Sequence, residues 1–129
     1  PMPNYTYDPI HIRSQDPSAT AQWYETMFGA KVIESTQPDG TQRIDLDING
    51  LTVFIMRVAE DDPAPGADTD ASLGLDHFGL RVENMDEAYA ELTAKGAEFT
   101  MEPRTIRPGV TITYIVAPEN VRIELLQRD

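Results

Sequence analysis

The feature that most constrains how this chain can fold is a pattern of local signals that occurs twice. Each half indicates a strand, a short turn, a helix ended by glycine and a further strand, in the stretches PIHIRSQDPSATAQWYETMFGAKVI and GLDHFGLRVENMDEAYAELTAKGAEF. A unit that recurs along a sequence predicts two similar structural modules. Because one such module leaves a face of its sheet uncovered, the two modules must pair with each other or across a dimer.

Both helices have defined ends in the sequence. Asp16 followed by Pro17 is a strong helix start, and Gly29 is a typical stop. Asn84 and Gly96 serve the second helix in the same way. The side chains expected to face the core are Ala19, Trp23, Met27 and Phe28 in the first helix and Met85, Ala88, Leu92 and Ala94 in the second.

Further strands follow each helix, with the turn signals PDG and NG between those of the first half. They are expected over roughly 30–35, 42–48 and 51–58, and over 97–101, 110–116 and 121–127. The polar residues 59–74, rich in Pro and Gly, indicate a linker between a first module at about 8–58 and a second at about 75–127. The prediction is one α+β domain over residues 1–129, built from two tandem βαβββ modules.

Composition excludes several kinds of function. None of the 129 residues is cysteine, so disulfides, thiolate nucleophiles and thiolate metal sites are absent. The net charge of −12 argues against nucleic acid as a partner. No apolar run is long enough for a membrane span, so we expect no membrane partner and a cytoplasmic location. The acidic excess serves solubility or, as a sharper alternative, attraction of a cationic ligand.

Strand alternation places polar residues on the sheet face that points away from the helices. The titratable residues on this face that matter most are His11, Arg13, Arg43, Asp45, His77 and Glu124. Aligning the two halves on their helix caps pairs Pro9 with His77, and aligning their last strands pairs Phe54 with Glu124. A face of this composition is either solvated or the lining of a cup.

Four stretches together resemble a known superfamily: DPSATAQWYETMFGAKV, DHFGLRVENMDEAYAEL, AKGAEF and YIVAPENVRIELL. From about residue 8 to residue 127 the chain resembles the vicinal oxygen chelate superfamily. That superfamily includes glyoxalase I, methylmalonyl-CoA epimerase, extradiol dioxygenases, fosfomycin resistance enzymes and bleomycin resistance proteins. The resemblance implies a glyoxalase-like fold, with curved mixed sheets around a cup. It is more specific for the fold than for the reaction.

In the metal-dependent members, each module supplies one metal ligand from its first strand and one from its last. The resemblance implies His77 and Glu124 as the ligands from the second module. The first module departs from the pattern, because Pro9 and Phe54 stand at its two ligand positions. His11, two residues beyond Pro9 on the same face, is the candidate for a third ligand. Two histidines and one carboxylate suit a divalent ion of Fe, Mn, Zn or Ni.

The function that the resemblance implies is a metal-dependent lyase, isomerase or ring-cleaving, extradiol-type dioxygenase. Its substrate would be a small, oxygen-rich, anionic organic molecule that chelates the metal through vicinal oxygens. Glu124 and Asp45 are the candidates for a general base. The candidates for substrate binding are Arg13, Arg43, Phe54, Met56, Arg104, Arg107 and Tyr114. Arg104 and Arg107 belong to EPRTIRPG, which is expected to be a loop.

Each interpretation has an alternative. His77 could be an ordinary strand histidine, and Glu124 could pair with Arg122 or Arg81. A rival function is a metal-free, ligand-sequestering protein of the bleomycin-resistance type that binds a cationic drug-like molecule. The two lost ligand positions and the net charge favour this rival, whereas retention of His77 and Glu124 favours the enzyme. We expect a homodimer in either case.

Overall fold

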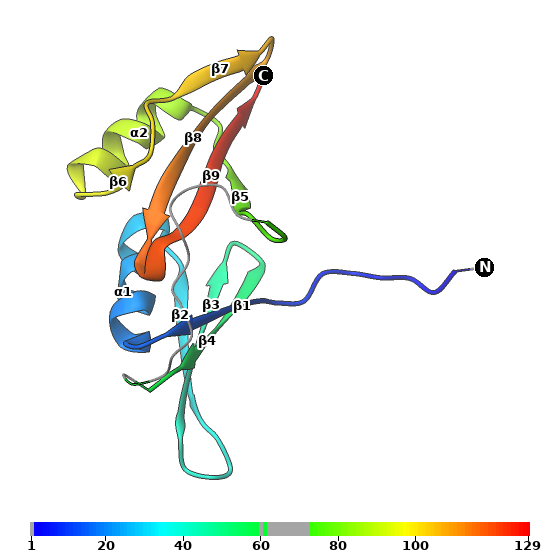
Figure 1. The fold of residues 1–129 in the computed structure, drawn as a ribbon, viewed down its shortest axis with the longest axis vertical. Coiled ribbons are helices and arrows are strands. Elements are labelled where there is room, and N and C mark those ends of the chain that lie inside the picture. The colour runs from blue at the N-terminus through cyan, green and yellow to red at the C-terminus, as the bar shows by residue number, and fades with distance from the viewer. Residues whose placement is uncertain (1, 60, 62–72) are drawn as a thin grey trace. The chain divides into compact units, whose positions relative to one another are not determined.

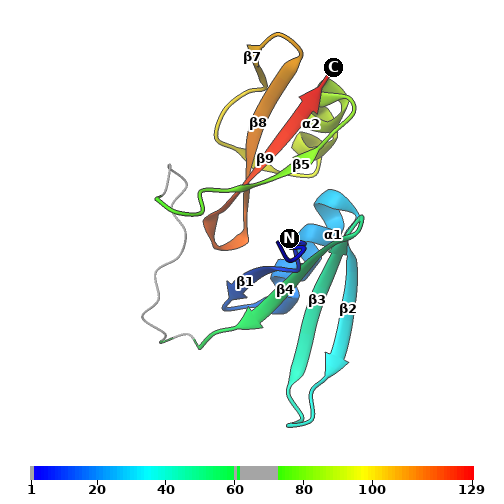
Figure 2. The ribbon, with the colours of Figure 1, turned by 90° about the vertical axis from the view of Figure 1, so that its right-hand side faces the viewer.

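The structure, a computed structural model, describes residues 2–59, 61 and 73–129. The chain divides into two compact units, residues 1–63 and residues 64–129. Each unit contains an open, mixed sheet and one α-helix that contacts it (Figure 1, Figure 2). Most of the linker predicted at 59–74 lies outside the described residues.

Unit 1 contains its elements in the order that the sequence predicts. They are β1 (Ile10–Ser14), α1 (Pro17–Phe28), β2 (Lys31–Thr36), β3 (Gln42–Ile48) and β4 (Leu51–Arg57). The strand order across the sheet is β1-β4-β3-β2 (Figure 2). β1 runs parallel to β4, whereas the other neighbours are antiparallel. The first and last strands of the unit therefore lie next to each other.

Unit 2 repeats this topology with one strand broken in two. Its elements are β5 (Phe78–Arg81), α2 (Met85–Ala94), β6 (Glu98–Phe99), β7 (Arg104–Arg107), β8 (Val110–Ala117), the short 3-10 helix η1 (Pro118–Asn120) and β9 (Val121–Arg128). The order is β5-β9-β8-β6, and β7 also pairs with β8, on the edge where β6 lies. β5 is parallel to β9. The predicted α+β architecture with two curved, mixed sheets is confirmed.

The helices begin and end where the sequence predicts, because side chains and glycine satisfy their terminal groups. Oδ1 of Asp16 accepts a hydrogen bond from the Ala19 amide at 3.1 Å. Oδ1 of Asn84 does the same for the Glu87 amide at 3.1 Å. Gly29 ends α1 in the left-handed conformation, with φ of 67°. No described helix is long and apolar enough to cross a membrane.

The predicted buried stripe of α1 is wrong in its phase. The residues of α1 that are buried are Pro17, Thr20, Ala21 and Tyr24, while Ala19 is exposed and Trp23 is half-buried. The physical reason is a hydrogen bond of 2.8 Å between the hydroxyls of Thr20 and Ser14, both fully buried. This bond lets a polar residue face the core, which an apolar pattern cannot reveal.

One face of each sheet packs on the helix, as strand alternation predicts. In unit 1 the buried residues of β3 and β4 are Ile44, Leu46, Ile48, Val53 and Ile55. In unit 2 the buried residues on the corresponding face of β8 and β9 are Thr113, Ile115, Ala117, Ile123 and Leu125. The hydroxyl of Thr113 donates to the carbonyl of Met101 at 2.7 Å, so this polar group is not buried without a partner.

The segment EPRTIRPG contains a strand, which corrects the prediction of a loop. β7 (Arg104–Arg107) pairs antiparallel with β8, and all four of its residues are exposed. The prolines that suggested a loop, Pro103 and Pro108, lie immediately outside the strand. Proline is tolerated there because β7 is an edge strand. Arg104 and Arg107 are therefore held by a sheet.

Tyr24 is the largest side chain that is fully removed from solvent. The rings of Trp23 and Phe28 pack around it, with centroids 5.0 and 6.0 Å from its own. Its hydroxyl has no hydrogen-bond partner among the described residues. Burial raises the pKa of the Tyr24 phenol, because a phenolate would be costly in these surroundings.

We expect Tyr24→Phe to raise the free energy of unfolding by about 1 kcal/mol, because it removes a buried hydroxyl without a partner. The raised pKa of Tyr24 means that the wild type loses stability as pH rises above the ordinary tyrosine range, so the gain should grow at alkaline pH. Urea unfolding at neutral and alkaline pH measures both effects. Tyr89→Phe, at a half-buried tyrosine packed on Phe99, is the control. A less stable Tyr24→Phe protein would mean that the hydroxyl has a partner.

Candidate functional site

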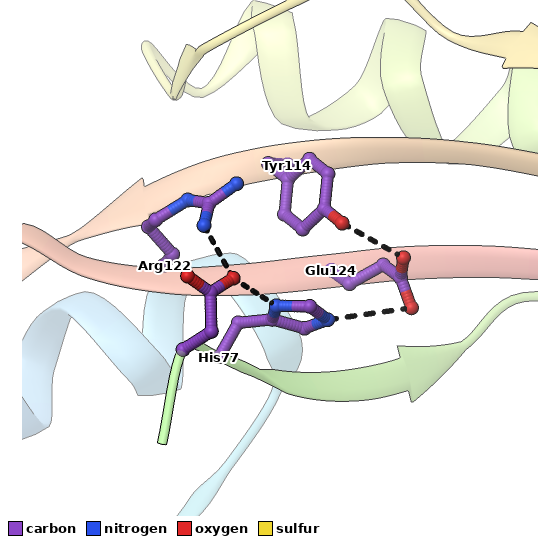
Figure 3. Close-up of polar contacts among 5 residues, drawn as sticks. His77, Tyr114, Arg122 and Glu124 are labelled. Atoms are coloured by element: carbon purple, nitrogen blue, oxygen red, sulfur yellow. Dashed lines mark hydrogen bonds and ion pairs between the residues drawn. The ribbon is translucent and has the colours of Figure 1, made fainter. Parts of the chain in front are cut away.

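The sheet of unit 2 gathers a group of polar side chains around Glu124 (Figure 3). Tyr114 belongs to β8, Arg122 and Glu124 belong to β9, and His77 immediately precedes β5. Glu124 is the register partner of Tyr114 on one side and of Gly79 on the other. These side chains therefore share the sheet face that points away from the buried core.

His77 and Glu124 face each other, and each is held by a second partner. Nε2 of His77 lies 3.9 Å from Oε1 of Glu124, which is too long for a hydrogen bond. Nδ1 of His77 is 2.7 Å from Oδ2 of Asp76, and the Tyr114 hydroxyl donates to Oε2 of Glu124 at 3.1 Å. Because a carboxylate can only accept, Nδ1 of His77 is the nitrogen that donates to Asp76. Nε2 is the ring nitrogen that faces Glu124.

Arg122 contacts the second partners of His77 and Glu124, namely Asp76 and Tyr114. Its Nη1 donates to Oδ2 of Asp76, and its guanidinium carbon lies 4.4 Å from the centre of the Tyr114 ring. The Arg122 side chain is only 12% exposed. The sequence suggested Arg122 as a partner of Glu124, whereas the structure pairs it with Asp76. Asp76 was missed from the sequence, although its place beside His77 was an available signal.

The electrostatics keep Tyr114 a hydrogen-bond donor. Its pKa is raised, first by burial and then by the negative charge of Glu124 and the hydrogen bond to that carboxylate. Gly79 of β5 has no side chain to cover the Glu124 carboxylate. A Cβ at position 79 would lie 3.7 Å from Oε1 of Glu124. The side chains of Glu124 and His77 are 17% and 28% exposed, so a ligand can reach a partly desolvated pair.

The corresponding face of unit 1 carries a different cluster. Phe54 is the register partner of His11 and of Asp45. The rings of His11 and Phe54 meet edge to face, with centroids 6.3 Å apart. Nε of Arg43 donates to both oxygens of Asp45, at 3.1 and 2.9 Å, and the Arg43 guanidinium lies 4.2 Å from the centre of the Phe54 ring. Here a cation is held between a ring and a carboxylate.

The two units correspond position by position when their strands are aligned by register. The pairs that close the last hairpin of each unit are Ile48 with Leu51 and Ala117 with Val121, and aligning these pairs sets the rest of the strands in register. The corresponding positions are Phe54 and Glu124, His11 and Gly79, Asp45 and Tyr114, and Pro9 and His77. The sequence alignment of the two halves predicted the same pairing of Pro9 with His77 and of Phe54 with Glu124.

The residues present fit half of a metal site. Among the described residues of either unit, no three His, Cys, Asp or Glu side chains are grouped so as to hold a metal. Unit 2 offers two donor atoms, Nε2 of His77 and Oε1 of Glu124. Asp76 and Tyr114 bond to the other polar atoms of these side chains, as residues that orient metal ligands do. Pro9 and Phe54 offer no donor atom at the matching positions. His11 stays a predicted third ligand.

The remaining predicted substrate-binding residues lie on the same sheet faces. Arg13 and Met56 are register partners, and each lies two residues beyond the His11–Phe54 pair, on the same face. Met56 is 50% exposed. In unit 2, Arg104 pairs with Ile112 of β8, two residues before Tyr114.

Residues 6–125 match the family described as the Glyoxalase/Bleomycin resistance protein/Dioxygenase superfamily. The match covers nearly the whole sequence, and the chain belongs to this superfamily. The resemblance inferred from the sequence is confirmed.

A curated relative is described as a probable chloroplastic lactoylglutathione lyase of Arabidopsis thaliana. It is 33% identical to this chain over 60 residues, which are 46% of this chain and 17% of the relative. The chain therefore spans less than a fifth of that protein's length.

Solved structures share the fold over nearly the whole chain. A glyoxalase family protein from Enterococcus faecalis is 24% identical, with a TM-score of 0.72 and coverage of 95% of this chain and 97% of that one. TioX from Micromonospora sp. ML1 is 20% identical, with a TM-score of 0.71 and coverage of 97% and 100%. A variant of the fosfomycin resistance protein FosX from Listeria monocytogenes, complexed with Mn(II) and 1S,2S-dihydroxypropylphosphonic acid, is 20% identical, with a TM-score of 0.69 and coverage of 93% and 87%. At these identities the similarity establishes the glyoxalase-like fold.

We expect Arg122→Met to lower the free energy of unfolding by about 2 kcal/mol, because it removes the cation bonded to Asp76 and stacked on Tyr114. Arg128→Met removes the same charge from an exposed position at the end of β9 and should change stability by less than about 0.5 kcal/mol. Urea unfolding of the two variants measures the difference. Equal losses would show that Arg122 acts only through the net charge.

Proposed function

We propose that this chain is a metal-dependent enzyme of the glyoxalase and dioxygenase type, acting on a small, oxygen-rich, anionic organic molecule. The supporting observation is the pairing of His77 with Glu124, whose Nε2 and Oε1 face each other at 3.9 Å. A pair with a purely structural role would be expected to close to hydrogen-bond distance. The wider spacing, with an outer partner on each side chain, suits two ligands of one cation.

In this proposal His77 and Glu124 hold a divalent ion of Fe, Mn, Zn or Ni. Such an ion would bind two vicinal oxygens of the substrate and stabilise the negative charge that develops on them. Asp76 engages Nδ1 of His77 and leaves Nε2 as the nitrogen available to a metal, and the Tyr114 hydroxyl orients the Glu124 carboxylate. The ligands that unit 2 lacks would come from His11 or from a second copy of the chain in the predicted homodimer.

The reaction classes compatible with this site differ in what they require. A lyase or isomerase needs a group that accepts a proton from the substrate. Glu124 is the stronger candidate, because within the described residues its Oε1 accepts no hydrogen bond, whereas both oxygens of Asp45 accept from Arg43. A ring-cleaving dioxygenase needs two histidines and one carboxylate, which the chain provides if His11 joins the set.

We expect protein purified without a metal-binding tag to contain near-stoichiometric Fe, Mn, Zn or Ni. His77→Ala and Glu124→Ala should each abolish the metal, because each removes one of the two ligands of unit 2. Asp76→Asn should weaken metal affinity by roughly tenfold, since it disturbs the orientation of His77 and leaves the ligands in place. Elemental analysis and a competition titration with a chelator measure these effects.

Two further results decide the ligand set. Loss of metal in His11→Ala would assign the third ligand to unit 1, and full retention would remove His11 from the set. Wild-type protein that contains no metal and also refuses added Fe, Mn, Zn and Ni would contradict the enzyme proposal.

A ligand-sequestering protein without a metal is the second candidate, and unit 1 favours it. Pro9 and Phe54 supply no donor atom where unit 2 has His77 and Glu124. The guanidinium of Arg43 already occupies a place between an aromatic ring and a carboxylate. A cationic, partly aromatic ligand would find the same two partners, and the net charge of −12 would attract it.

For this second function we expect metal-free protein to bind benzamidinium, a small aromatic cation. Phe54→Ala should weaken that binding by about tenfold, because it removes the ring, and Arg43→Gln should strengthen it, because it removes the internal competitor. Arg57→Gln changes the charge equally at an exposed position and separates the competitor from a net-charge effect. Calorimetric titration measures all four proteins. A wild type that binds neither benzamidinium nor larger aromatic cations would exclude this candidate.

A further inference from the structure

All five arginines of unit 2 lie on the sheet face that carries Glu124. Their register pairs are Arg104 with Ile112, Arg107 with Val110, Arg128 with Val110, Arg122 with Val116 and Arg81 with Leu126. Cross-strand partners point to the same side of a sheet, and side chains alternate along β8 and β9. The partners Val110, Ile112 and Val116 lie an even number of residues from Tyr114 in β8, and Leu126 lies two residues from Glu124 in β9, so all of them are on the face of Tyr114 and Glu124. The five arginines therefore share one face with the candidate site.

A β-bulge in β7 is what brings two of these arginines together. Arg104 and Arg107 are three residues apart, so a regular strand would direct them to opposite faces. The register shifts between Thr105 and Arg107, which inserts Ile106 as an extra residue. The hydroxyls of Thr105 and Thr111 meet at 3.1 Å, and they mark the opposite face of the sheet. The bulge therefore places Arg107 on the same face of the sheet as Arg104.

The acidic side chains nearest the candidate site are already engaged, and another lies at the far end of β8. Glu124 is engaged by Tyr114, and Asp76 is engaged by Arg122. Glu98, in β6, pairs with Val116 at the end of β8 remote from β7. The side chains of Arg81, Arg104 and Arg107 are exposed and form no ion pair with a described residue. In a chain of net charge −12, this is a local site of positive charge that attracts anions.

The arrangement also has an apolar floor next to the candidate site. Across the sheet, one row of side chains runs Arg104, Ile112, Leu126, Arg81, and the next row runs Tyr114, Glu124, Gly79. The two rows are two residues apart along the strands, or about 7 Å. Ile112 is buried and Leu126 is half-buried, so a small molecule in contact with Glu124 can extend over Leu126 toward the arginines of this face.

We propose that Arg81, Arg104 and Arg107 bind an anionic group, a carboxylate or a phosphonate, of the molecule that acts at His77 and Glu124. Guanidinium groups suit such anions because they donate two parallel hydrogen bonds to planar or tetrahedral oxyanions. Leu126, which is half-buried, contacts the carbon skeleton between the anionic group and the reacting oxygens. The proposal rests on the proposed enzyme function only in assigning the anion to the substrate.

An exposed edge strand also carries charge for another reason, namely to prevent pairing with other chains. That role needs charge anywhere along β7 and is served equally well by arginines on opposite faces. It gives no reason for a bulge that aligns Arg107 with Arg104, or for the placement of Arg81 on the same face from β5. The common face is the feature that an anion site explains.

The test uses the full chain after treatment with a chelator, so that its result does not depend on a metal. Methylphosphonate and acetate are titrated while the Nε–Hε signals of the arginines are followed by NMR. We expect the signals of Arg81, Arg104 and Arg107 to shift, and the double variant Arg104→Gln/Arg107→Gln to bind methylphosphonate about tenfold more weakly. Arg57→Gln, in unit 1, and Lys95→Gln, in α2, each remove a positive charge away from this face and should leave the affinity unchanged.

An equal loss of affinity in the controls, an unchanged affinity in the double variant, or no anion binding by the wild type would each overturn the proposal. The proposed enzyme function fails separately, through the metal content of the wild type. A protein that binds methylphosphonate through Arg104 and Arg107 but takes up no metal keeps the anion site and loses the metal-dependent reaction.

Discussion

The contacts of His77 and Asp76 with the last strand depend on the parallel pairing of the first and last strands within a unit. In unit 2 this pairing joins β5 to β9 and sets Gly79 opposite Glu124. Because side chains alternate with a period of two, a shift of one residue would turn Glu124 into the core and separate it from His77. The helix after the first strand returns the chain to the same end of the sheet, and the antiparallel strands that follow leave the last strand parallel to the first. The backbone thus brings together residues that are distant in the sequence.

Both units obey this constraint, and they carry different chemistry at equivalent positions. In unit 2, His77 contacts Asp76 and Glu124 accepts a hydrogen bond from Tyr114. Arg122 donates to Asp76. Unit 1 has Phe54 at the position of Glu124, with Arg43 stacked on it and bonded to Asp45. The first unit therefore favours contacts with rings and charges, while the second unit offers donor atoms for a cation. Membership of the superfamily accounts for the shared backbone, and the side chains decide between an enzyme and a binding protein.

The parts of the fold that could be predicted have local signals. Asp16 and Asn84 cap their helices as their sequence context indicates, and β3 (Gln42–Ile48) has the predicted bounds because its alternation is regular. The phase of α1 was mispredicted because Thr20 faces the core through a bond to Ser14, a residue of another element. Of the site, the correspondence of Phe54 with Glu124 was accessible to alignment, whereas the contact of Asp76 with Arg122 joins residues 46 positions apart and has no local signal.

The sequence by itself determined the repeat, the order of the helices and the longer strands, and the face on which residues of the regular strands lie. Those properties follow from periodicities of two and 3.6 residues and from caps a few residues long. Only the tertiary structure decided the partners. Arg122 binds Asp76 and not Glu124, and a bulge in β7 places Arg107 on the same face as Arg104. Such pairings depend on the register between strands that are remote in the chain and on distances between side-chain tips, and a local pattern of residue types encodes neither.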